Sequence, residues 1–244
     1  MNAESYLQAL DVTSSRLSDE TRALLHAENE VVTEGFKLLN SVFHALCAYS
    51  EDDGASDDLL KSARTTTALR ISKTLQAAFV LQERDMTAES LSLCRDALEA
   101  AFAWKYLEMN PKSVRHWFNA AWQREDEFSF ARIVGATGDR ARVYELYSLL
   151  CKFCHPTGMT FSVGVSIEPS NYSMGWRKLC CGCILVVTRR YIEAVLSMYG
   201  GHLFHTDVPA LVWQERARVT AVRLFDGFSE DFKEAQRAYL TAVS

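Results

Sequence analysis

The residues with the richest chemistry lie in the segment 151–158, CKFCHPTG. Cys151, Cys154 and His155 match the C-x-x-C-H pattern by which c-type haem is attached, and Cys180 and Cys183 form a second C-x-x-C pair. Together the pairs read C-x2-C-x25-C-x2-C, which is close to a four-thiolate zinc pattern but has a spacer longer than the usual roughly 15–20 residues. The third interpretation is structural, because both pairs lie in apolar, helix-like sequence, where free cysteine is readily buried.

The N-terminal sequence predicts the compartment of these thiols. Residues 1–17 lack the basic region and following apolar run of a secretory signal. No stretch approaches the roughly 20 apolar residues that a membrane helix requires. We therefore predict a cytoplasmic protein, without a membrane segment, whose cysteines are free thiols. Haem attachment generally follows export, so we predict no haem and no other cofactor, and we favour core packing over zinc for the four cysteines.

A charged pair interrupts an apolar helical stripe in the segment 88–109. Arg95 lies four residues after Leu91 and three before Leu98, and Glu99 follows Arg95 by four. A charge on a core-facing surface is costly unless it is paired or used. Two interpretations remain open: a partly exposed ion pair of the kind that stabilises a helix slightly, or a buried structural or catalytic pair.

The segment 139–154 predicts a helix with two different faces. One face is apolar, and the other carries Tyr144, Ser148, Cys151 and His155 at helical spacing. His155 would lie at the C-terminal end of the helix, where the helix dipole favours the charged imidazolium. His155 is therefore a candidate functional group, and the alternative is a core histidine whose ring nitrogens are satisfied.

The composition favours an all-α fold. The chain is 48% hydrophobic and 23% charged, with only 4 Pro and 11 Gly in 244 residues, which suits neither disorder nor many short strands. Asn110-Pro111 predicts one helix boundary, and Gly200-Gly201 predicts a break. Apolar periodicity and these breaks predict major helices over 18–49, 57–82, 88–109, 111–124, 139–154, 173–199 and 208–242, with a short helical piece near 127–134.

One segment departs from helical periodicity. Apolar and small or polar residues alternate from Phe161 to Ile167, which predicts a short strand-like arm near 160–168. A lone strand is unstable, so this arm must pair with a hairpin partner or with the same strand of a second subunit. The second option predicts a homodimer. We otherwise expect a single α-helical domain over 1–244, with a core bundle at 18–200 and a C-terminal helix at 201–244.

The segments SLCRDALEAAFAWKYL and YELYSLLCKFCHPTG carry a resemblance to a known family. They are similar to bacterial all-helical proteins known only as a domain of unknown function, which have an R-x-x-x-E helix followed by a Y-x-x-x-S…H-P helix end. That family is similar in turn to the wider HEPN-like group, and the resemblance covers about residues 20–200. The matching positions are Arg95, Glu99, Tyr144, Ser148, His155 and Pro156.

This resemblance implies a HEPN-like bundle and suggests RNA as a partner. Many HEPN-like proteins are ribonucleases of toxin–antitoxin or phage-defence systems, and their signature separates an arginine from a histidine by four to six residues on one helix. None of the six histidines here has that spacing; Arg22 is separated from His26 by only three residues. The net charge of −5 also argues against a general polyanion binder.

Two functional hypotheses follow. The first is a cytosolic helical binding or accessory protein, linked by the resemblance to phage defence or stress, whose polar cluster within the bundle is a structural core or a small-ligand pocket. Tyr144 and Ser148 would be its binding residues. The second is a divergent, metal-independent endoribonuclease with a composite site, in which His155 acts as acid or base and Arg95, paired with Glu99, steadies phosphate charge.

Overall fold

The computed structural model describes residues 25–54, 57–84, 86–123, 128–154, 171–203 and 208–225. These ranges consist of helices and the turns between them, and no strand occurs within them. The predicted all-α fold is therefore confirmed. The predicted strand-like arm at 160–168, His155 and the chain beyond residue 225 lie outside the described residues.

The predicted helices are present, with corrections at their ends. Asp57 caps α3 by accepting a hydrogen bond from the Leu59 amide at 2.9 Å, and α4 ends immediately before Asn110-Pro111, as the sequence predicts. Thr87 is the first residue of α4, one position before the predicted start, and its side chain is buried. The observed bounds are α2 His26–Asp52, α3 Asp58–Glu83, α4 Thr87–Met109, a 3-10 turn Pro111–Ser113, α5 Val114–Gln123, α6 Phe130–Ala136, α7 Arg140–Cys154, α9 Asn171–Leu203 and α10 Val208–Phe225.

The predicted break at Gly200-Gly201 is wrong, because α9 continues through both glycines to Leu203. Glycine costs a helix interior only about 1 kcal/mol relative to alanine. That cost is small for a helix of 33 residues whose middle is packed on several neighbours.

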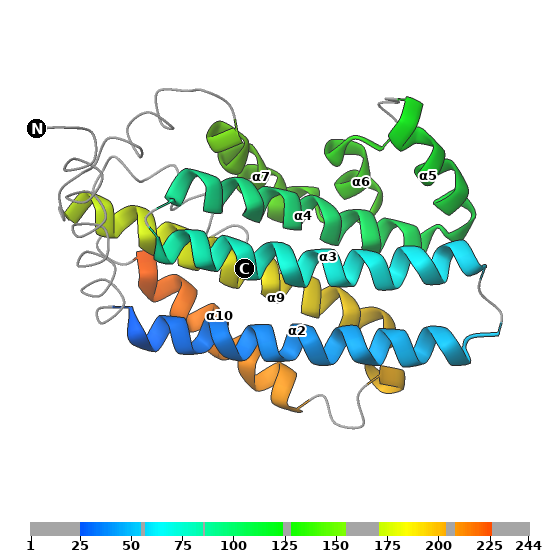
Figure 1. Ribbon diagram of the computed structural model, residues 1–244, viewed down its shortest axis with the longest axis horizontal. Helices are drawn as coiled ribbons and strands as arrows, with labels where there is room; N and C mark the ends of the chain where they lie inside the picture. The colour runs from blue at the N-terminus through cyan, green and yellow to red at the C-terminus, as the bar shows by residue number, and fades with distance from the viewer. Residues whose placement is uncertain are drawn as a thin grey trace, which may run out of the picture.

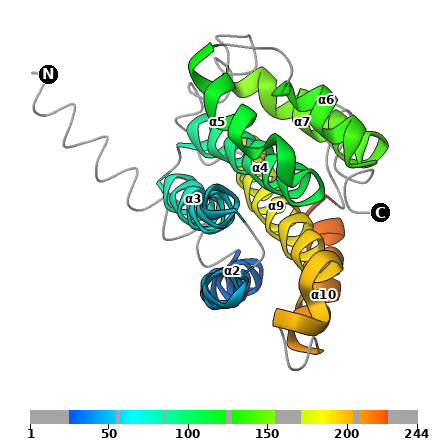
Figure 2. The ribbon, with the colours of Figure 1, turned by 90° about the vertical axis from the view of Figure 1, so that its right-hand side faces the viewer.

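Four long helices, α2, α3, α4 and α9, form the centre of the molecule (Figure 1). The end-on view shows α2 and α3 on one side of α9, with α4 packed between α3, α9 and the shorter helices (Figure 2). Helix α10 covers α2 and α9, while α6 and α7 lie on the side of α4 that faces away from α2. Helix α4 therefore carries both core contacts and the contacts that hold the shorter helices.

Helix α9 is buried along most of its described length. Between Leu179 and Thr188 every side chain is at most 2% exposed, which explains why its sequence is apolar on all sides rather than amphipathic. Burial of this kind contributes about 25 cal/mol for each Å² of apolar surface removed from water. Four fully buried free cysteines belong to this core, and we call them the buried thiols: Cys94, Cys180, Cys181 and Cys183.

Helix α10 approaches α2 closely at Trp213. Trp213 is 3% exposed, and its indole Nε1 donates a hydrogen bond to the carbonyl of Val31 at 2.8 Å. A Cβ atom added at Gly35 would lie 2.5 Å from Cζ2 of Trp213. The absent side chain of Gly35 is thus what makes room for the indole ring.

Candidate functional site

Arg95 and Glu99 form a partly buried pair on the side of α4 that faces α7. Nε of Arg95 lies 3.6 Å from Oε1 of Glu99, and its NH2 group lies 3.1 Å from Oδ1 of Asp96. The Arg95 side chain is 24% exposed, and each carboxylate is 37% exposed. Burial alone would lower the pKa of Arg95, but Glu99 and its other neighbours outweigh that effect and raise the pKa. The pair is therefore more buried than a surface ion pair but not fully buried, so it falls between the exposed ion pair and the buried pair that the sequence left open.

Helix α7 completes this cluster with Tyr147. The Tyr147 hydroxyl donates a hydrogen bond to Oε1 of Glu99 at 2.8 Å. Burial raises the pKa of Tyr147, and the neighbouring Glu99 carboxylate raises it further. The phenol is therefore a neutral donor that holds Glu99 in one orientation.

Tyr144 and Ser148 lie toward solvent from the cluster, and the Tyr144 ring contacts its member Tyr147 with ring centroids 6.4 Å apart. The Tyr144 side chain is 38% exposed and lies beneath the guanidinium of Arg140, which is 5.4 Å from the ring centroid. Ser148 is also exposed. Helix α7 packs against the core through Val143 and Leu146, so the neighbouring position 147 points toward Glu99.

The two C-x-x-C pairs have different surroundings. Cys151 and Cys154 are partly buried between α4 and α7, and Sγ of Cys154 lies 3.3 Å from Oγ of Ser92. Burial raises the pKa of Cys151, while the hydrogen bond with Tyr147 and the charge of Arg95 act in the opposite direction. Cys180 and Cys183 are fully buried, and burial raises the pKa of Cys180 to about 12. Across the described ranges, no group of three or more His, Cys, Asp or Glu side chains is arranged to hold a metal ion.

A pocket of about 430 Å³ opens beside the Glu99–Tyr147 pair. Its floor is the α4 face that carries Ala100 and Ala103, whose small side chains leave space between the surrounding helices. The pocket is lined by Thr67 and Arg70 from α3, Asp96, Glu99, Ala100 and Ala103 from α4, Trp117 from α5, Phe128, Ser129, Phe130 and Ile133 at and before α6, and Tyr147 from α7. We call this the α4–α7 pocket.

Aromatic rings form much of the wall of the α4–α7 pocket. Phe130 stacks on Tyr147, with ring centroids 3.9 Å apart and an interplanar angle of 21°. Phe128 packs edge-on against Tyr106 at 6.0 Å. Trp117 supplies a further ring from α5. Apolar walls with a few placed polar groups are typical of small-molecule sites.

A second polar cluster lies where α2, α3, α4 and α9 meet, and sequence reasoning missed it. We call it the Arg64 cluster. Nε of Arg64 donates to Oε1 of Glu108 at 2.8 Å, and its NH1 group donates to Oγ of Ser50 at 3.1 Å. The guanidinium lies 5.1 Å from the ring centroid of Tyr49 and 5.5 Å from that of Tyr199, whose hydroxyl donates to Glu108.

The sequence contained the same indication for Arg64 as for Arg95. Arg64 follows Leu60 by four residues and precedes Ala68 by four, so it interrupts the apolar stripe of α3. Its side chain is 2% exposed and that of Glu108 is 5% exposed. Because its polar groups are paired with one another, the Arg64 cluster is better suited to fixing the helix arrangement than to binding a ligand.

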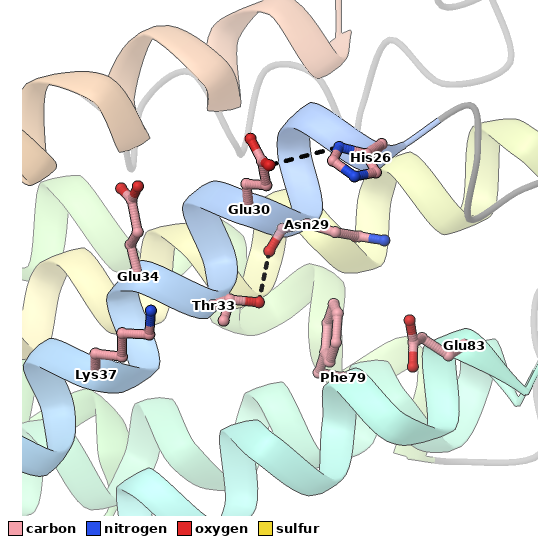
Figure 3. Close-up of a pocket in the computed structure, with 8 residues that line it drawn as sticks. All are labelled: His26, Asn29, Glu30, Thr33, Glu34, Lys37, Phe79 and Glu83. Carbon is pink, nitrogen blue, oxygen red and sulfur yellow. Dashed lines mark hydrogen bonds and ion pairs between the residues drawn. The ribbon is translucent and has the colours of Figure 1, made fainter.

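A further pocket of about 480 Å³ lies between α2 and α3 (Figure 3). Acidic and polar side chains of α2 line one wall, while Phe79 and Glu83 extend from α3 (Figure 3). Glu34 is already paired with Arg216 of α10 at 2.6 Å. Phe79 is the one phenylalanine, tyrosine or tryptophan among the described residues that line it, so this pocket offers a ligand less apolar surface than the α4–α7 pocket.

No helix in the described ranges combines the length and apolarity needed to cross a lipid bilayer. In comparisons with known proteins, no family model matches the chain, and neither the curated proteins nor the solved structures contain a match.

Proposed function

We propose that the protein is a cytosolic helical binding or accessory protein whose α4–α7 pocket holds a small organic ligand. The single observation that carries this proposal is the pocket itself, in which aromatic walls meet two carboxylates on α4. Tyr147 orients one of those carboxylates, Glu99, by a hydrogen bond of 2.8 Å. Preorganised polar groups beside aromatic rings in one pocket favour binding of a defined ligand.

The ribonuclease alternative stays a prediction. Arg95 already contacts two carboxylates, which counts against its use as a phosphate contact, because an anion would have to compete with both of them. RNA cleavage by the purified protein in EDTA, lost in both H155A and R95A, would favour the nuclease over the binding protein. The HEPN-like relationship, the RNA partner and the homodimer likewise remain predictions.

A fragment screen by ligand-observed NMR tests the proposed function. It should be run on the wild type and on Ala103→Leu, which places a larger side chain on the pocket floor. Ala27→Leu is the matched control, because Ala27 is an exposed residue of α2 outside the pocket. We expect fragments that bind the wild type and Ala27→Leu but not Ala103→Leu. Fragments that bind all three proteins equally would contradict the proposal.

A further inference from the structure

Two carboxylates and several aromatic rings line the α4–α7 pocket together. We propose that its ligand class is the planar organic cation, a flat ring that carries an amidinium or similar N–H-rich group at one edge. This inference rests on the proposed function, since it names the ligand of the same pocket.

Asp96 and Glu99 present unused hydrogen-bond acceptors to the pocket. They lie three residues apart on α4 and therefore on one face of the helix. Asp96 uses Oδ1 to contact Arg95, and Glu99 uses Oε1 to accept from Tyr147. Within the described residues, no hydrogen bond reaches Oδ2 of Asp96 or Oε2 of Glu99. Ionised carboxylates accept strong, often paired hydrogen bonds from a planar, charged N–H donor.

The local charge favours a cation over an anion. Arg95 offsets one of the two carboxylates, so the cluster of Arg95, Asp96 and Glu99 keeps one net negative charge. Arg70 is the other cation that lines the pocket, but it is exposed to solvent. Its charge is therefore screened more strongly than those of the partly buried carboxylates. An anionic ligand would meet the unused carboxylate oxygens and be repelled.

The aromatic walls favour a flat ligand and add to the preference for positive charge. Phe130 and Tyr147 are stacked nearly parallel, and Trp117 and Phe128 extend the wall. Aromatic faces are electron-rich, so they attract a nearby cation and also stack with another ring. A ring with a cationic edge satisfies both the walls and the carboxylates.

The size of the pocket limits the ligand to a small one. At about 430 Å³, it lies in the lower part of the range of about 300–1,000 Å³ typical of small-molecule sites. Ala100 and Ala103 line the pocket and are 8% and 9% exposed, and their small side chains leave the space beside them open. A ligand of one or two rings fits these dimensions.

Calorimetric titration of the full-length protein with three matched probes tests this inference. Benzamidine is a planar cation, benzamide is its neutral counterpart of nearly the same shape, and benzoate is the matching anion. We expect benzamidine to bind at least about tenfold more tightly than benzamide, because hydrogen bonds to charged partners are roughly twice as strong as neutral ones. We expect no measurable binding of benzoate.

Three variants test whether the preference for benzamidine arises in the α4–α7 pocket. Glu99→Gln keeps an acceptor for the Tyr147 hydroxyl but removes the charge, and it should weaken benzamidine binding about tenfold. Asp96→Asn should act in the same direction and serves as the second variant if Glu99→Gln folds poorly. Glu89→Gln is the matched control, because Glu89 is an exposed carboxylate of α4 outside the pocket, and the affinity of this variant for benzamidine should stay within about twofold of the wild type.

The outcomes separate this inference from the proposed function. Equal affinity for benzamide and benzamidine, or unchanged benzamidine affinity in both carboxylate variants, would overturn the cationic ligand class. If pocket-dependent fragments were found in the NMR screen at the same time, the proposed function would stand and only the ligand class would fail. If the screen also gave no binding sensitive to Ala103→Leu, both would fail.

Discussion

Removing Glu108 from the Arg64 cluster should destabilise the protein strongly. The Arg64 side chain is 2% exposed, and Glu108 accepts two of its hydrogen bonds, at 2.8 and 3.2 Å. In Glu108→Leu, the polar partners left to the guanidinium among the described residues would be Ser50 at 3.1 Å and Asp53 at 3.5 Å. Breaking one side of a buried ion pair costs about 3–5 kcal/mol. For a chain of this size, that corresponds to a fall in Tm of about 10 °C.

A double-mutant cycle separates the interaction free energy between Arg64 and Glu108 from the contributions of their other contacts. Arg64→Met alone should cost a similar amount, because it leaves the Glu108 carboxylate buried without its cation. The double variant should lose at least about 2 kcal/mol less than the sum of the two single variants, since well-packed apolar residues replace a buried pair at little cost. The free energies would be measured by urea unfolding followed by circular dichroism.

An exposed ion pair supplies the matched control. Arg216 and Glu34 lie 2.6 Å apart, but their side chains are 49% and 41% exposed. Arg216→Met should therefore cost less than about 1 kcal/mol despite the shorter distance. If Glu108→Leu cost no more than Arg216→Met, the reasoning from burial would be refuted.

Three further predictions concern packing, ionisation and the pocket. Gly35→Ala should lower Tm in thermal unfolding, because its Cβ would lie 2.5 Å from Trp213. Gly135→Ala is the control and should leave Tm unchanged or raise it, because no neighbouring atom lies within 4 Å of the added Cβ. Equal changes in Tm would contradict the close packing of Gly35 on Trp213. Burial raises the pKa of each of the buried thiols above its ordinary value of 9.0, so their contribution to stability is complete below pH 9 and is lost as pH rises above it. The loss is about 1.4 kcal/mol per pH unit for each thiol, and a flat free energy of urea unfolding between pH 9 and pH 10 in reducing buffer would count against their burial. Tyr147→Phe removes the hydrogen bond to Glu99 and should lower the free energy of urea unfolding by about 1 kcal/mol. Tyr144→Phe should leave that free energy unchanged. A larger loss in Tyr144→Phe than in Tyr147→Phe would show that α7 is rotated relative to the structure.

The fold class and most helix ends could be predicted from sequence because their causes are local. Apolar residues at helical spacing identify a helix that packs on one side, and the proline at 111 marks the end of α4 through its effect on the residue before it. The break predicted at Gly200-Gly201 is absent, because glycine costs a helix interior little compared with what the packing of the long helix α9 contributes.

The candidate site was predicted only in part. Arg95 and Glu99 were identified because a charge inside an apolar stripe is unusual, and the same rule applied to Arg64 would have identified the second cluster. The predicted face of α7 carried Tyr144, which is exposed, whereas Tyr147 is the residue that contacts Glu99. Which tyrosine points toward α4 depends on how α7 packs against it. Periodicity within one helix does not contain that information.

The α4–α7 pocket could not be predicted from the sequence. Its walls come from five separate helices, and Thr67 and Tyr147 are eighty positions apart in the chain. Neither residue interrupts a local pattern. Only the packing of α3 and α7 on opposite sides of α4 brings them to one cavity.

A crystal structure of the protein with bound benzamidine would show where the ligand binds. We expect it in the α4–α7 pocket, with its amidinium group against Asp96 or Glu99 and its ring against the aromatic wall. The acidic pocket between α2 and α3 (Figure 3) is the competing location. Benzamidine bound there, with the α4–α7 pocket empty, would show that the α4–α7 pocket is not the binding site.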